Sequence, residues 1–476
     1  MTILLLALAL VVLAVTFAVF VRLERQGRRH VGTLLVFALL ALEGALYSQF
    51  EEMPTSLFHP AIGGLGFRIF EILIPLLLAA RAFVCGGPRT VGTTSLLWVA
   101  FLAWYATAAV LGWLQGNDVD EIWFQGRAII YIGGGFALAA GASAGGLADP
   151  ARGLVRLVRP MALVAGVLAL TDSVGISIDL ELPLLPLEEL GDLAADTASL
   201  LGSFAFVAVA WRAALRDRSV ALALAPAPLV VVAVVTEQRA ALLALATSAV
   251  VMAAAFWLPA GRRRVSVTGS DVAIAVLAVA GVLMVQALGT AIVRGDEPAL
   301  PLAGAVTDAF ESRSKAMSAQ ARINQWRAFP QLISERPVMG WGLGVEFQYF
   351  LPGENRVVNS AIAHNIGADL WLRSGLLGLL LFFVAAGSTV RDGFLAWRHH
   401  PERLVAVMGL VGSAVVVGLL TKGMVESTFE NHRLATLLGL FLGIARVART
   451  SYEGASSPAA PGLSPSRASD RELTWN

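Results

Sequence analysis

The feature that most constrains this chain is a succession of apolar runs, each close to the length of a membrane-spanning helix. An α-helix needs about 20 mostly apolar residues to cross the hydrocarbon core of a bilayer. The composition agrees, because 57% of the 476 residues are hydrophobic and 14% are charged. An ordinary soluble domain is roughly half apolar and about a quarter charged. We therefore predict an all-α, polytopic protein embedded in the lipid bilayer.

The apolar runs predict a transmembrane helix bundle of about 12–13 spans. The predicted spans are residues 2–21, 31–50, 65–83, 92–114, 128–146, 160–175, 197–214, 219–235, 240–259, 271–293, 366–387, 404–421 and 434–447.

The same pattern predicts four regions along the chain. Membrane helices are expected over 1–293 and again over 366–449. Between them, residues 294–365 form one large loop, in which we expect an amphipathic helix. Residues 450–476 are rich in Ser, Pro and Ala and are predicted to be a disordered tail, because such a composition cannot bury a core.

The loops between the predicted spans alternate in charge, and this alternation predicts the orientation. Arginines gather at 22–29, 81–89, 152–159, 212–218, 262–264, 391–403 and 446–449. The intervening short loops are acidic or nearly neutral. Short loops rich in Lys and Arg stay cytoplasmic. The pattern places the amino terminus and the large loop outside and the carboxyl tail inside.

Charge and cysteine content exclude several kinds of partner. A net charge of +1, with no dominant basic stripe, argues against a nucleic-acid partner. The single cysteine, Cys85, excludes an intrachain disulfide and a multi-cysteine metal site. We expect no bound metal and no cofactor.

The first candidate for chemistry is the pair His364 and Asn365, which stands where a polar loop enters an apolar span. A histidine at a water–membrane boundary can accept or donate a proton near neutral pH. An interfacial histidine beside a helix-capping asparagine is the alternative interpretation. Of six histidines, only His59, His364 and His432 are predicted on the outer side, which favours His364 as the candidate base.

A second candidate begins at Arg322, in the sequence Arg-Ile-Asn-Gln-Trp-Arg-Ala-Phe-Pro. The spacing of apolar residues predicts an amphipathic helix lying over the membrane domain. These residues are Ile323, Trp326, Phe329 and Ile333. The segment Pro337-Val-Met-Gly-Trp-Gly-Leu-Gly344 follows, and its glycines predict a turn. A packed surface helix and a plain loop are the alternative interpretation of this pattern.

The third candidate is Arg239, which begins an apolar helix at the predicted outer face. A guanidinium stays charged, and its fork of N–H groups suits phosphate. A charge at that position is costly unless it faces a cavity or a partner. Snorkelling to lipid headgroups and an ion pair with Glu237 remain open as alternatives.

These segments together resemble a known family. Five motifs follow one another along the chain. They are an Arg followed by small and leucine residues, an R-x-x-x-W helix in a long outer loop, a P-x-x-G-x-G-x-G turn, the pair H-N, and a span that contains G-x-x-G. In that order they resemble the O-antigen ligases, the related polysaccharide polymerases and the protein O-oligosaccharyltransferases. The resemblance covers roughly residues 220–447.

The resemblance implies a GT-C-like fold and a glycan transferase of O-antigen or exopolysaccharide assembly. It also implies a multi-pass protein of the bacterial inner membrane, whose predicted outer face, with the large loop, is the periplasmic face. The donor would be a glycan on undecaprenyl diphosphate, and the acceptor a hydroxyl of a glycan, a lipid A-core or a protein. No metal or nucleotide sugar would be bound. Ligase and polymerase both remain open.

The resemblance also assigns roles to individual residues. Arg239 would contact the diphosphate, and His364 would activate or orient the acceptor. Arg322 would be a second phosphate or glycan contact. The supporting positions would be Asn365, Trp326 and Gly342.

Residue chemistry alone adds Arg68 and Arg127, both at predicted outer helix ends, as substrate contacts. Arg68 could equally pair with Glu71 at i,i+3. The alternative function is a non-enzymatic carrier, either a lipid-linked glycan flippase or a small-solute transporter. Such a carrier needs titratable groups deep in its spans, and Glu43 and Glu71 are the only candidates.

Overall fold

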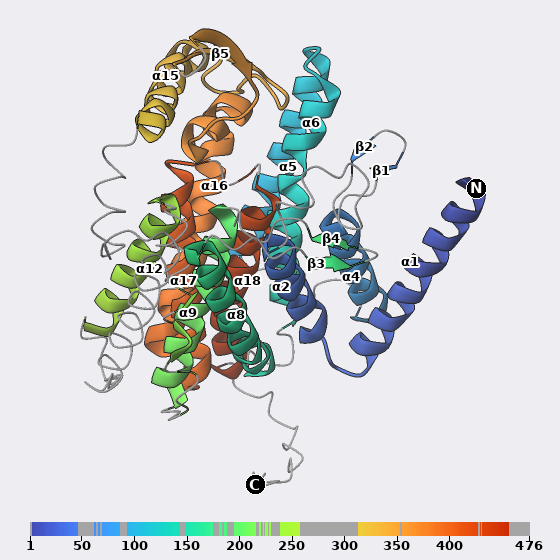
Figure 1. Cartoon of the computed structure of the whole chain (residues 1–476). Coiled ribbons are helices and arrows are strands. Elements are labelled where there is room, and N and C mark those ends of the chain that lie inside the picture. The colour runs from blue at the N-terminus through green and yellow to red at the C-terminus, as the bar shows by residue number, and fades with distance from the viewer. Residues whose placement is uncertain are drawn as a thin grey trace, which may run out of the picture.

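A computed structural model shows the chain as a bundle of helices, with α15 and β5 at one end (Figure 1). It describes residues 2–45, 61–62, 65–66, 69–85, 93–142, 148–174, 180–182, 185–187, 195–215, parts of 219–229, 239–257, 313–352, 355–426, 429 and 431–456.

The helices of the first half are α1 (Thr2–Arg25), α2 (His30–Ala45), α4 (Ile69–Cys85), α5 (Thr93–Leu114), α6 (Val119–Gly126), the π-helix η1 (Ile129–Gly133), α7 (Gly134–Ala142), α8 (Ala148–Val174) and α9 (Ala195–Leu215). Those of the second half are α12 (Arg239–Trp257), α15 (Arg313–Glu335), α16 (Ile366–His399), α17 (Arg403–Gly423) and α18 (His432–Ser456).

Helices lie in every predicted span that falls within the described residues. The predicted span 271–293 lies outside them, as does most of 219–235. By length and composition, four described helices could cross a membrane: Thr93–Leu114, Ile366–His399, Arg403–Gly423 and His432–Ser451. Shorter apolar helices cover His30–Leu40, Ser199–Arg212 and Ala240–Phe256. The prediction of a mostly helical protein with membrane-spanning helices is thus confirmed.

Helix α17 is the centre of the second half of the bundle. It packs against α9, α12, α16 and α18. Nearly all of its side chains are buried, including every residue from Leu404 to Val416. The helix is apolar all round, in Val, Leu, Ala and Gly, and a helix of that kind is stable where other helices cover every side.

Helix α16 is broken at Gly375, where φ is +68° inside an otherwise helical segment. The break leaves the carbonyls of Leu372 and Arg373 to find partners outside the helix. The backbone N–H of Trp341 donates to Leu372 O at 2.8 Å, and that of Gly342 to Arg373 O at 3.0 Å. The glycine turn thus supplies the hydrogen bonds that the break removes.

The same turn, residues 337–344, also contacts α5 and the loop that follows it. Leu343 N donates to Ala108 O at 2.9 Å. The Asn117 amide donates to the carbonyls of Trp341 and Leu343 at 3.1 and 2.8 Å. The turn therefore joins α5 to the break in α16, and this fixes the direction in which the first part of α16 points.

Replacement of Gly375 by alanine should destabilise the protein strongly. The backbone there, at φ +68° and ψ −177°, is essentially restricted to glycine, at a cost of order 1–3 kcal/mol for other residues. A Cβ would also lie 1.9 Å from Val338 O. Thermal unfolding of the detergent-solubilised variant should show a clear fall in Tm. Gly387→Ala is the control, because a Cβ at Gly387 meets nothing within 4 Å. Equal melting temperatures for the two variants would contradict this prediction.

Three short antiparallel hairpins depart from the prediction of an all-α fold. They are β1 (Ala61–Ile62) with β2 (Leu65–Gly66), β3 (Leu180–Leu182) with β4 (Leu185–Leu187), and β5 (Phe347–Leu351) with β6 (Arg356–Ser360).

The β5–β6 hairpin lies in the predicted large loop, and its register runs from Phe347↔Ser360 to Leu351↔Arg356. Alternate side chains of a strand point to opposite faces, and Phe347 is buried on the face that meets α15. Its ring lies 4.9 Å from that of Phe329. A partner helix distant in the sequence thus stabilises a strand pair that local pattern did not predict.

The predicted apolar face of α15 is only partly correct. Phe329 is buried, but Ile323 and Trp326 are 39% and 40% exposed. The buried positions are Ala321, Gln325 and Phe329, spaced four residues apart. Helix α15 packs against β5 and α16, so the position of these elements selects the buried face. The positions of the apolar residues along the helix do not determine which face is buried.

Candidate functional site

Asn365 ties the start of α16 to the end of α17. Its side-chain oxygen accepts a hydrogen bond from Ala368 N at 2.9 Å and so caps α16. Its amide nitrogen donates to Met424 O at 2.9 Å. Both polar atoms of the Asn365 side chain are therefore engaged within the protein. The predicted supporting position has the geometry of a residue that holds His364 in place.

His364 stands just before this cap, partly buried, between β6 and α16. Its Nδ1 is buried and has no hydrogen-bond partner among the described residues. Burial lowers the pKa of His364 below its ordinary value, and the positive charge of Arg322 lowers it further, while Glu426 acts in the opposite direction. A neutral imidazole with an unused ring nitrogen can accept a proton.

Arg322 reaches the same place from α15. It is partly buried, and its Nη1 donates to Val425 O at 3.1 Å. No other hydrogen bond from this guanidinium is found within the described part of the chain. The remaining N–H groups of Arg322 can therefore serve a ligand, while the bond to Val425 fixes the side chain beside His364.

Two charged residues of this group were missed by sequence reasoning. Lys422 is completely buried near the end of α17, with its Nζ 3.2 Å from Glu426 Oε2. It also donates to Ser199 Oγ of α9 at 3.2 Å. One signal was present in the sequence, since Lys422 is one of only two lysines in the chain. Glu426 in turn acts on His364.

The backbone of Arg239 lies towards the same end of the bundle. Helices α12 and α17 run antiparallel, because Gly418 faces Ala244 while Phe256 stacks on Trp397 near the start of α17. At about 1.5 Å per residue, this register brings the first residue of α12 level with the turn after α17. The Arg239 side chain lies outside the described residues.

Arg127 has a partner of its own at the end of α6. Its Nε lies 3.4 Å from Glu71 Oε1, and its guanidinium rests over the rings of Trp123 and Phe124 at 5.7 and 5.5 Å. The hydroxyl of Tyr131 also donates to Glu71. The described charges that act on His364 are Arg322 and Glu426, not Arg127. Arg68, the partner proposed for Glu71, lies outside the described residues.

Trp326 follows Arg322 by one helical turn on α15, and its side chain is exposed. Among the described residues, no group of three or more His, Cys, Asp or Glu side chains could hold a metal ion. The site as described thus consists of one histidine, one arginine, a lysine–glutamate pair and an exposed tryptophan.

Comparison with known families matches residues 221–383 to the model of the O-Antigen ligase family. The matched segment contains Arg239, Arg322, His364 and the broken part of α16. No curated protein matched the chain. Residues 221–383 are therefore similar to the O-antigen ligase family, and together with the apolar helices this similarity indicates a multi-pass bacterial membrane protein.

Proposed function

We propose that this protein transfers a glycan from an undecaprenyl-diphosphate carrier to a hydroxyl acceptor, at the periplasmic face of the bacterial inner membrane. The observation that carries the proposal is the gathering of His364, Arg322 and the 422–426 turn at one end of the bundle. Helix α12, which starts with Arg239, begins towards that end. The family match supports the reaction class, and the GT-C-like architecture is part of the proposal.

The proposed reaction is a displacement at the anomeric carbon of the donor sugar. The acceptor oxygen forms a bond to that carbon as the bond from carbon to the diphosphate oxygen breaks. The acceptor proton passes to His364, and the electron pair leaves with the diphosphate. The arginines Arg239 and Arg322 would stabilise the charge that develops on the diphosphate, so this route requires no metal ion.

The other residues have supporting roles in the proposal. Asn365 fixes the position of His364 through the α16 cap. Trp326, exposed beside Arg322, offers an aromatic face to a sugar ring. Arg127, already paired with Glu71, and Arg68 remain weaker candidates for contact with the glycan or the carrier. The acceptor, whether a glycan, lipid A-core or protein, is left open, and so is the choice between ligation and polymerisation.

The alternative is a carrier that moves a lipid-linked glycan or a small solute without chemistry. The observation that most favours a carrier is the carboxylate of Glu71, because it is buried within the helix bundle. Its ion pair with Arg127 and its bond from Tyr131 give Glu71 a structural role, since a buried charge is stable only when it is paired and hydrogen-bonded.

Reconstitution of the purified full-length protein in liposomes tests the two functions directly. With an undecaprenyl-diphosphate-linked glycan and a hydroxyl acceptor, the proposed enzyme should release undecaprenyl diphosphate and form elongated or ligated glycan. The yield should be the same with a chelator present. Movement of intact donor across the bilayer without release of undecaprenyl diphosphate would identify a carrier.

The pH dependence of transfer should reflect the lowered pKa of His364. The neutral imidazole is the active form, so turnover should fall only as the pH drops below 6.5, the ordinary pKa of a histidine side chain. Arg322→Gln removes a positive charge, which raises the pKa of His364 and moves the acid limb to higher pH. Glu426→Gln should move the limb to lower pH. The check is the position of the limb in pH–rate profiles of the three proteins, and an identical limb in all three would contradict the role of His364.

A further inference from the structure

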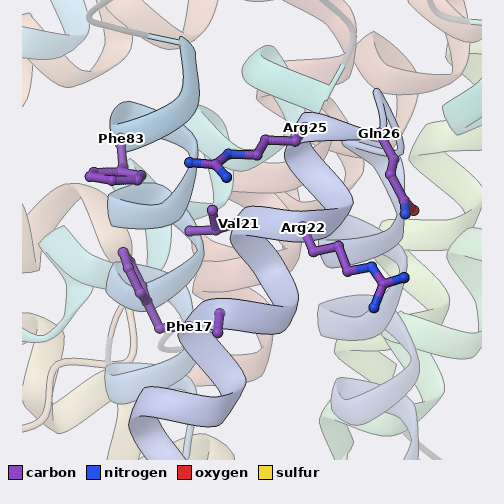
Figure 2. Close-up of a pocket in the computed structure, with 7 residues that line it drawn as sticks. Phe17, Val21, Arg22, Arg25, Gln26 and Phe83 are labelled. Carbon is purple, nitrogen blue, oxygen red and sulfur yellow. The ribbon is translucent and has the colours of Figure 1, made fainter.

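A cleft of about 550 Å³ lies between α1 and α4 (Figure 2). The end of α1 that lines it lies at the other end of the bundle from α15 (Figure 1). It is lined by Phe17, Ala18, Val21, Arg22, Arg25, Gln26 and Phe83. Its volume falls within the range of small-molecule sites, roughly 300–1,000 Å³. None of its residues belongs to the proposed transfer site.

One wall of the cleft is apolar and is formed by side chains of α1 and α4. The rings of Phe17 and Phe83 meet edge to face, with centroids 6.2 Å apart. Phe83 is 66% exposed, although it is a large apolar side chain. Such a surface is suited to a long hydrocarbon chain.

The other part of the cleft is cationic. Arg22 and Arg25 are exposed, and neither guanidinium has a hydrogen-bond or ion-pair partner within the described part of the chain. Glu24, the acid between them, is already paired with Arg81 at 3.0 Å and with Arg29 at 3.7 Å. The described residues thus supply no counter-charge to Arg22 or Arg25.

Figure 2 shows how these side chains lie around the cleft. Arg25 extends to the side on which Phe17 and Phe83 lie, whereas Arg22 and Gln26 extend to the other side. A ligand that meets Arg25 therefore also meets the aromatic wall. Charge complementarity requires that the ligand place an anionic group at the arginines. The aromatic wall requires that the same ligand carry an apolar chain.

We propose that this cleft binds an anionic glycerophospholipid of the surrounding membrane. Its phosphate would accept hydrogen bonds from Arg25, with Arg22 as a second cation, because the guanidinium fork suits phosphate. One acyl chain would lie along Phe17 and Phe83. Inorganic phosphate would fill only the cationic part, and a zwitterionic lipid would bring a cation of its own to the arginines.

A less specific explanation is that arginines at the end of α1 merely attract anionic lipid and fix the orientation of the chain. Under that explanation the exposed Arg28, which does not line the cleft, would contribute as much as Arg25. The two explanations therefore predict different arginines to contribute to lipid binding. The lipid site requires Arg25 and not Arg28, whereas diffuse attraction requires both equally.

Native mass spectrometry of the full-length protein in detergent distinguishes them, with phosphatidylglycerol and phosphatidylcholine of equal chain length as probes. Retention of phosphatidylglycerol should weaken about fivefold in Arg25→Gln and about thirtyfold in the double variant Arg22→Gln/Arg25→Gln. Arg28→Gln should bind as the unaltered protein does. Phe83→Ala should weaken retention while leaving both arginines in place.

Several outcomes would overturn the lipid site. One is an equal loss in Arg28→Gln, and another is equal retention of phosphatidylcholine. If inorganic phosphate displaces the lipid and Phe83→Ala has no effect, the cleft takes a free anion instead. All these readouts are independent of glycan transfer, so they stand or fall separately from the proposed function.

Discussion

Replacement of His364 by alanine should reduce glycan transfer by about a hundred- to ten-thousandfold, the usual contribution of a general acid or base. His364 is the proposed acceptor of the hydroxyl proton, and its buried Nδ1 has no partner among the described residues. The acceptor oxygen would then attack while still protonated. Binding of the lipid-linked donor should be unaffected, because the arginines that meet the diphosphate remain.

The measurement is glycan formation in cells at matched protein levels, together with donor binding by the purified variant. His399→Ala is the matched control, because His399 is an exposed histidine in the last turn of α16, at the opposite end of that helix from His364. A large loss in His364→Ala with only a small loss in the control supports proton transfer. Near-normal glycan in His364→Ala would mean that the histidine is a structural residue in the segment between β6 and α16.

Arg239→Lys should also be severely impaired, by about a hundredfold or more, with weaker donor binding as well as slower turnover. Lysine keeps the positive charge but loses the planar fork that can hold two phosphate oxygens at once. Loss of a group that stabilises developing charge typically costs about a hundred- to a thousandfold in rate.

The matched control for this variant is Arg391→Lys, since Arg391 is an exposed arginine in the later part of α16. Glycan formation and donor affinity should be unchanged there. If Arg239→Lys behaves like the control, Arg239 snorkels to lipid headgroups, as lysine does equally well. Normal glycan in both His364→Ala and Arg239→Lys would make the carrier the better explanation of this protein.

Much of this protein follows from local sequence. The lengths of the apolar runs predicted helices at the right places, because a chain within a bilayer must satisfy each backbone N–H and C=O inside the same segment. The apolar run predicted a span that starts at residue 366, and the alternative interpretation of Asn365 as a helix cap is confirmed, since its side chain accepts from an N–H of the first turn. The order of the motifs predicted a resemblance to the O-antigen ligases, and the match over 221–383 confirms that similarity for this segment.

Other features were decided only by tertiary structure. The buried Glu71 is paired with Arg127, a residue distant in the sequence, and local spacing did not predict that pair. The turn at 337–344 joins the break at Gly375 to α5, more than 200 residues earlier in the chain. Lys422 and Glu426 join the site because α9, α15, α16 and α17 meet there.

The physical reason is the same in each case. Periodicity and length record how a segment satisfies its own backbone and which residue types it can bury. They carry no information on which distant segment provides the burial, the counter-charge or the missing hydrogen bond. On α15 the apolar pattern therefore selected Trp326, which is exposed, while packing against β5 buried Gln325.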